Sequence, residues 1–184
     1  PILLIKSGLN TEFEIEAAIS HIDATFTNSL LAVKSYEVED NLLLYSLCCL
    51  FNSKLQTYFL FQNGTSSGVE REQRFDEKLH PFPLKSDNSI ITFTKDLIKL
   101  KRLIEIHKKC SSANHIKIAE YEKQFDEKEE GLNQLIFNLY NLTETERDLI
   151  DYAQKITIPI LQSKNKKYRE IRENPIWFMP YKKV

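Results

Sequence analysis

The sequence predicts an α+β fold, with a small mixed β-sheet packed on a buried helix and followed by a hairpin of long helices. Short apolar runs of strand length lie within residues 1–34. A strongly apolar segment with helical spacing follows, and long amphipathic patterns begin near residue 94. The chain has 184 residues, 42% of them hydrophobic, which is enough for one domain with a packed core or one domain with a helical appendage.

Three strands are expected in the first part of the chain. Pro1–Lys6 is an apolar run that ends at Ser7-Gly8. Phe13–Glu16 alternates between apolar and acidic residues, and Ala24–Lys34 is rich in Thr, Phe, Leu and Val.

The strongest helix prediction covers Glu37–Phe61. This segment is apolar nearly all round, which is typical of a buried helix rather than a surface one. The polar loop Asn63–Gly68 ends it and contains two of the four glycines of the chain. One stripe of this helix is expected to pack on the preceding strands: Leu43, Leu47, Leu50 and Leu55.

Three further helices are predicted. Thr94 is expected to cap a helix that continues to about residue 109, and a second long helix covers about residues 116–140. Thr143 and Glu146 form the sequence pattern of a capping box, which starts a third helix. That helix is expected to end before Pro159.

Composition limits the classes of function. The net charge of −1 gives no global positive field for nucleic acid or membranes, although the end of the chain, residues 163–184, is basic. Three cysteines cannot make a disulfide framework, which favours reduced thiols in the cytoplasm. No apolar run can cross a bilayer, and no signal peptide precedes the first strand. Because the chain starts at Pro1 without an initiator Met, we interpret it as an excised piece of a longer polypeptide or as a processed one.

Few residues suggest catalysis or metal binding. His107, Cys110 and His115 have the chemistry of zinc ligands, but a structural site needs four ligands and the other cysteines lie in an apolar helix. Asn174–Trp177 is similar to the Asn-Pro-Pro-aromatic motif of adenine-directed DNA methyltransferases, but it lacks the second proline, and a turn before a small aromatic cluster is the preferred interpretation. We therefore expect no catalytic residue, metal or cofactor in this chain.

The glycine loop is a better candidate for a site, because its hydroxyls and amides can hold phosphates and its arginines can read guanine. A plain surface loop is the alternative, in which Arg71 pairs with Glu70 or Asp76. Arg71 or Arg74 is expected to read a base edge, and Lys6 to add a phosphate contact. The candidate DNA-binding residues are Lys6, Thr65, Ser66, Ser67, Gly68, Arg71 and Arg74.

Several segments taken together resemble the target-recognition region of type IIG restriction-modification enzymes and related adenine-specific DNA methyltransferases. In order, they are Leu3–Lys6, Phe26–Ser29, Leu50–Leu55 with Tyr58-Phe59, Ser66–Arg71 with Pro81–Pro83, and Leu135–Glu144. The resemblance covers about residues 1–152. Ser67 stands where the family often has an aromatic residue. Asn141 replaces a usual glycine, and asparagine tolerates the left-handed conformation that ends a helix.

The resemblance implies a DNA sequence-recognition domain, with double-stranded DNA and an upstream methyltransferase domain of the same polypeptide as partners. It implies that the parent transfers a methyl group from S-adenosylmethionine to a flipped adenine, and such parents often carry a magnesium-dependent nuclease. Residues 1–90 would be the recognition subdomain, 91–157 a helical spacer and 158–184 a basic C-terminal segment. The alternative function is a helical protein-interaction module that docks a partner subunit.

Overall fold

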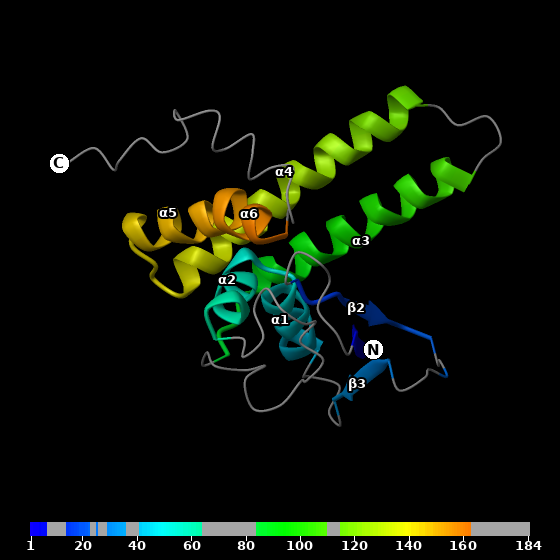
Figure 1. Ribbon diagram of the computed structural model, residues 1–184. Helices are drawn as coiled ribbons and strands as arrows, with labels where there is room; N and C mark the ends of the chain where they lie inside the picture. Colours follow the sequence, from blue (N-terminus) through cyan, green and yellow to red (C-terminus); the bar gives the residue numbers. More distant parts are fainter. Residues whose placement is uncertain are drawn as a thin grey trace.

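A computed structural model describes residues 1–6, 14–22, 25, 29–35, 41–63, 84–109 and 115–162 (Figure 1). A small sheet and a short buried helix lie together at one side of the molecule. Two long helices run past them. Three shorter helical segments follow from residue 144 onward and pack near the end of the second long helix. The α+β class predicted from the sequence is confirmed.

The sheet has three strands, β1 (Ile2–Lys6), β2 (Ala17–Ser20) and β3 (Leu30–Lys34), in the order β2-β1-β3. Ile5 pairs with Ala17 on one side and with Leu31 on the other, and both pairings are antiparallel. The predicted mixed sheet is therefore wrong. The ten residues between β1 and β2, from 7 to 16, are fewer than the dozen or so that a parallel crossover takes.

Two strand predictions differ in their bounds from the observed strands. The predicted strand Phe13–Glu16 lies before β2, and the described residues 14–16 are outside the ladder. The ladder cannot extend further because its neighbour β1 ends at Lys6, whose N–H donates the last bond to the Glu16 carbonyl at 2.9 Å. The observed strand β3 lies at the C-terminal end of the predicted strand Ala24–Lys34.

The predicted helix 37–61 is broken into α1 (Asn41–Phe51) and α2 (Lys54–Asn63). The Asn52 Nδ2 donates to the Cys48 carbonyl at 2.7 Å and to the Ala17 carbonyl at 2.9 Å. The Ser53 hydroxyl donates to the Leu50 carbonyl at 2.6 Å and accepts the Gln56 N–H at 3.2 Å, as an N-cap does. Side chains that compete for backbone groups in this way end α1 and start α2.

Burial of α1 is confirmed, but its leucine stripe is not the one predicted. Leu44 is 2% exposed and packs in a cluster with the sheet, whereas Leu43 is 42% exposed. Leu50 and Leu55 belong to a second cluster with the long helices, and Leu47 lies at the edge of the sheet cluster. Because α1 lies between the sheet and the long helices, it buries two faces instead of one.

The long helices α3 (Asn88–Lys109) and α4 (His115–Leu139) form the predicted hairpin (Figure 1). The predicted cap at Thr94 is wrong, because α3 begins six residues earlier. The Asp87 carboxylate accepts the Ser89 N–H at 2.7 Å, which is the geometry of an N-cap. Thr94 is 5% exposed, and its hydroxyl donates to the Ile90 carbonyl at 2.7 Å inside the helix.

The end of α4 and the start of α5 (Glu144–Tyr152) follow the prediction. Asn141 has a φ of 54°, the left-handed conformation that ends a helix. The capping box is confirmed: the Glu146 N–H donates to the Thr143 hydroxyl at 3.3 Å, and the Thr143 N–H donates to the Glu146 carboxylate at 2.7 Å.

The predicted stop before Pro159 is wrong. A π-helical turn, η3 (Ala153–Thr157), follows α5 and leads into α6 (Ile158–Gln162), which contains Pro159. The Ile158 N–H donates to the Ala153 carbonyl, five residues earlier. A proline lacks the N–H and clashes with the carbonyl four residues before it, so a wider turn at this point lets the chain stay helical.

The two clusters meet at α1 and contain side chains from both sides of residue 90. Ile91 and Ile98 of α3 pack against the sheet cluster, and Ile90 lies in the second cluster with Leu50 and Phe137. The division into a recognition subdomain (1–90), a helical spacer (91–157) and a basic C-terminal segment (158–184) stays a prediction. Among the described helices, none combines the length and the apolar composition that a membrane span requires.

Candidate nucleic-acid interface

The structure describes one of the seven predicted DNA-binding residues, Lys6 at the end of β1. Its Nζ lies 3.0 Å from Glu16 Oε1, and the two side chains are 48% and 57% exposed. Lys6 is thus accessible, but its charge is compensated by a neighbour. The other six predicted residues lie outside the described part of the chain: Thr65, Ser66, Ser67, Gly68, Arg71 and Arg74.

The helix that leads into the predicted loop is firmly anchored. α2 ends at Asn63, the residue before Gly64, and Leu55, Gln56 and Thr57 of its first turn are 5%, 0% and 4% exposed. The Lys54 N–H at its start donates to Asn133 Oδ1 of α4 at 2.9 Å. A bond to Asn133 across the fold fixes where α2 begins and how it is directed.

Charged side chains strengthen the same anchor, which we call the polar junction: Lys54, Glu130, Asn133, Asp151 and Gln154. The Lys54 Nζ lies 2.5 Å from Glu130 and 3.5 Å from Asp151, and Gln154 Nε2 donates to the Lys54 carbonyl at 3.2 Å. Burial lowers the pKa of Lys54, but the bonds to Glu130 and Asp151 outweigh this effect and leave the pKa above its usual value. The hydrogen bond from Lys54 lowers the pKa of Glu130.

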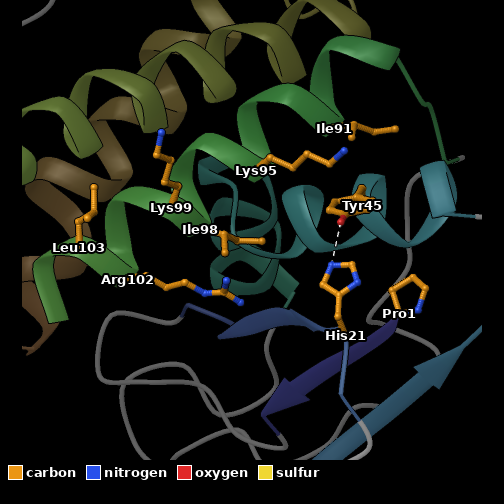
Figure 2. Close-up of a pocket in the computed structure, with 9 residues that line it drawn as sticks. All are labelled: Pro1, His21, Tyr45, Ile91, Lys95, Ile98, Lys99, Arg102 and Leu103. Carbon is orange, nitrogen blue, oxygen red and sulfur yellow. Dashed lines mark hydrogen bonds between the residues drawn. The ribbon is translucent and has the colours of Figure 1, made fainter. Parts of the chain in front are cut away.

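A groove of about 680 Å³ lies between α3 and the sheet, and we call it the α3 groove (Figure 2). His21, which follows β2, hydrogen-bonds through Nε2 to the Tyr45 hydroxyl of α1 at 3.1 Å on one side of the groove. Tyr45 is 5% exposed, and burial raises its pKa, with a further contribution from Cys48. The groove is lined by Pro1, His21, Tyr45, Ile91, Lys95, Ile98, Lys99, Arg102 and Leu103.

Three cations of α3 line this groove: Lys95, Lys99 and Arg102. They are spaced by four and three residues, which places them along one face of the helix, and all three are exposed. None of them makes an ion pair or hydrogen bond with any residue that the structure describes. The groove therefore has a positive wall without compensating carboxylates among those residues.

The opposite face of α3 differs, because its charges are matched by α4. Asp96 lies 2.7 Å from the Lys128 Nζ, and the Lys108 Nζ lies 2.8 Å from Glu122. The Lys101 Nζ lies 5.4 Å from the ring centre of Phe125. Charges on that face hold the hairpin together, and those facing the groove remain open to an outside anion.

The three groove cations are not among the residues predicted from the sequence to bind DNA. Their spacing is visible in the sequence as a helical stripe within a helix that was correctly predicted. Lys101 and Lys108 of the same helix are equally basic in sequence, so only the position of α4 distinguishes the two groups.

The cysteines of α1 are poor candidates for nucleophiles. Burial raises the pKa of Cys48 to about 12, with a contribution from Cys49, and burial raises the pKa of Cys49 to about 11. The Cys49 Sγ lies 2.7 Å from the Thr94 hydroxyl. Because the thiolate is the reactive form, both side chains are suited to packing rather than chemistry.

No three His, Cys, Asp or Glu side chains of the described residues are grouped so that they could hold a metal ion. His107 instead lies beside Tyr121, with ring centres 5.5 Å apart. Cys110 and the segment Asn174–Trp177 lie outside the residues that the structure describes.

Comparisons of the chain with models of known families, with curated proteins and with solved structures find no match.

Proposed function

We propose that this chain is the DNA sequence-recognition domain of a restriction-modification adenine DNA methyltransferase and is not catalytic in isolation. Its partners would be double-stranded DNA and an upstream domain of the same polypeptide that binds S-adenosylmethionine and transfers the methyl group. This role belongs to the cytoplasm, where the buried cysteines stay reduced.

The observation that supports this proposal most is the anchoring of α2 directly before the predicted reading loop. A binding loop is precise when the elements that carry it are rigid. The α2 helix is buried in its first turn and tied to α4 through Asn133, and the predicted loop begins one residue after its end. The resembling segment Leu50–Leu55 contains the break between α1 and α2, so these residues set the direction of α2.

In the proposed mechanism the arginines of the loop read bases, and other groups of the same loop hold the DNA backbone. The planar guanidinium of Arg71 or Arg74 matches O6 and N7 of guanine, with about 1–3 kcal/mol of discrimination for each pair. Thr65, Ser66 and the Gly68 amide donate hydrogen bonds to phosphate oxygens, which fix the register on the duplex. Methylation follows in the upstream domain.

The test is made in the full-length parent, with methylation of cognate and altered duplexes as the measurement. Arg71→Ala or Arg74→Ala is expected to relax the preference at one base position, whereas Lys6→Ala changes all duplexes equally. Equal losses on cognate and scrambled duplexes for both arginine variants would contradict the proposal and leave the loop with a structural role.

A second candidate function is docking of a partner subunit on the helical hairpin. Ile106 of α3 and Ile116 of α4 are 58% and 82% exposed, and both lie toward the tip of the hairpin. Association that persists at high salt and is lost in Ile106→Ser/Ile116→Ser would favour this function, because apolar contacts are not screened.

A further inference from the structure

We infer that the α3 groove is a phosphate-binding site along which the backbone of one DNA strand runs. This inference rests on the proposed function and deepens it, because it adds phosphate contacts on α3, within the predicted helical spacer, to those proposed for the loop and for Lys6.

The groove cations and Lys6 differ in whether a nearby carboxylate neutralises their charge. The Lys6 ammonium already has a carboxylate at 3.0 Å, so a phosphate would have to compete with Glu16. Lys95, Lys99 and Arg102 have no such competitor among the described residues. The next acid along α3, Glu105, acts on Lys108, whose pKa it helps to raise after the larger effect of Glu122.

The spacing of the cations suits a nucleic-acid strand. Seven residues separate Lys95 from Arg102, which corresponds to about 10.5 Å along a helix axis. One DNA strand advances about 3.4 Å per phosphate along the duplex axis and winds around that axis as it does so. Successive phosphates are therefore farther apart than this value, and the stretch matches about two or three of them. Three cations over that length can follow a backbone without reading its bases.

The shape of the groove favours a single strand backbone over a flat contact. Lys95 and Arg102 extend from α3 on either side of Ile98, and the imidazole of His21 rises from the sheet side toward Tyr45 (Figure 2). In the same view Lys99 and Leu103 point away from His21. Lys95 and Arg102 would therefore each contact a phosphate inside the groove, one on either side of Ile98, with Lys99 contacting a further one at its rim.

The test compares two double variants that remove the same charge. Lys95→Gln/Arg102→Gln changes the groove, and Lys123→Gln/Lys155→Gln removes two exposed cations of α4 and η3. Binding of a 20-base-pair duplex of arbitrary sequence is measured by fluorescence anisotropy between 50 and 200 mM KCl. Circular dichroism confirms that all three proteins are folded.

The groove variant is expected to lose about 1.8 from the slope of log affinity against log salt, at about 0.9 for each phosphate contact. The ratio of wild-type to variant affinity should then fall about 12-fold between 50 and 200 mM KCl. The control variant should keep the wild-type slope. A wild-type slope in the groove variant would overturn the phosphate site while leaving DNA binding, and so the proposed function, in place.

A second measurement tests the groove without DNA. Titration of the protein with inorganic tripolyphosphate is followed by amide NMR shifts, which should concentrate at residues 91–103 and at His21 and disappear in the groove variant. Shifts elsewhere, or none, would overturn the site. Tripolyphosphate binding in the groove by a wild type that binds no duplex would instead overturn the proposed function and the assignment of the groove to DNA.

Discussion

The neighbouring helices α1 and α3 differ in how they use their surfaces. α1 has no charged residue in its eleven positions, and its side chains fill the clusters on both of its faces. α3 has twice the length and carries charges along it, some paired with α4 and some facing the groove without a partner among the described residues. α1 therefore serves burial alone, whereas α3 combines a buried face with cations that a charged ligand can reach.

The largest expected effect comes from placing a charge in α1. Leu44→Asp would bury a carboxylate in the sheet cluster without a partner, at a cost of about 4 kcal/mol or more, and should unfold the domain. Leu43→Asp is the matched control, because Leu43 is the adjacent residue and is 42% exposed. Thermal unfolding followed by circular dichroism separates them, and equal melting temperatures would refute the assignment of burial.

The next effect is a loss of stability at alkaline pH that depends on the cysteines of α1. Burial raises the pKa of Cys48 from 9.0 to about 12, with a contribution from Cys49, and burial raises that of Cys49 to about 11. In the unfolded chain both thiols ionise near pH 9, and in the folded chain they stay protonated. The contribution of the protonated thiols to the free energy of unfolding is therefore fully present below pH 9. It is lost as the pH rises toward 11–12.

At pH 10 this loss amounts to about 1.4 kcal/mol for each thiol relative to neutral pH. Urea unfolding at pH 7 and pH 10 measures it, with Cys48→Ala/Cys49→Ala as the comparison. The variant should be less stable at pH 7, because it loses packing, but less sensitive to the change in pH. If wild type and variant lose equal stability between the two pH values, the thiols are not the cause.

A smaller effect is expected where α1 and α3 touch. The Thr94 hydroxyl lies 2.7 Å from the Cys49 Sγ in a buried position, and Thr94→Val keeps the shape but removes this partner. The expected cost is about 1 kcal/mol, since the buried hydroxyl and its contacts with Cys49 and the Ile90 carbonyl are lost. Thr92→Val, at an exposed position of the same helix, is the control and should change the free energy of unfolding little. No difference between these variants would show that the contact contributes no stability.

The smallest expected effect is a gain in stability rather than a loss. Lys95 and Lys99 lie four residues apart with like charges, which disfavours a helix by about 0.2–0.5 kcal/mol. Lys99→Gln should therefore raise stability slightly in urea unfolding at low salt, and the gain should shrink in 0.5 M KCl because salt screens the repulsion. Lys108→Gln, which breaks a pair with Glu122, should lower stability. A gain for Lys108→Gln would contradict the distinction between the two faces of α3.

Local patterns were sufficient for much of the fold. β1, the hairpin of α3 and α4, the left-handed Asn141 and the capping box at Thr143 all depend on residues close together in sequence, and each was predicted correctly. The fold class followed from the order of these patterns, because short apolar runs followed by long amphipathic segments leave few ways to bury the apolar faces.

Only the tertiary structure decided the features that depend on distant groups. The break at Asn52 uses the Ala17 carbonyl, thirty-five residues away, and the start of α2 uses Asn133. Thr94 was mistaken for a cap because its hydroxyl can equally bond inside a helix, and burial beside Cys49 settled which bond it makes. Lys95 and Lys108 look alike in the sequence, yet one faces the groove and the other meets Glu122. A charged side chain is available to a ligand or is neutralised depending on which element folds against it. The sequence of the helix alone does not show which of the two occurs.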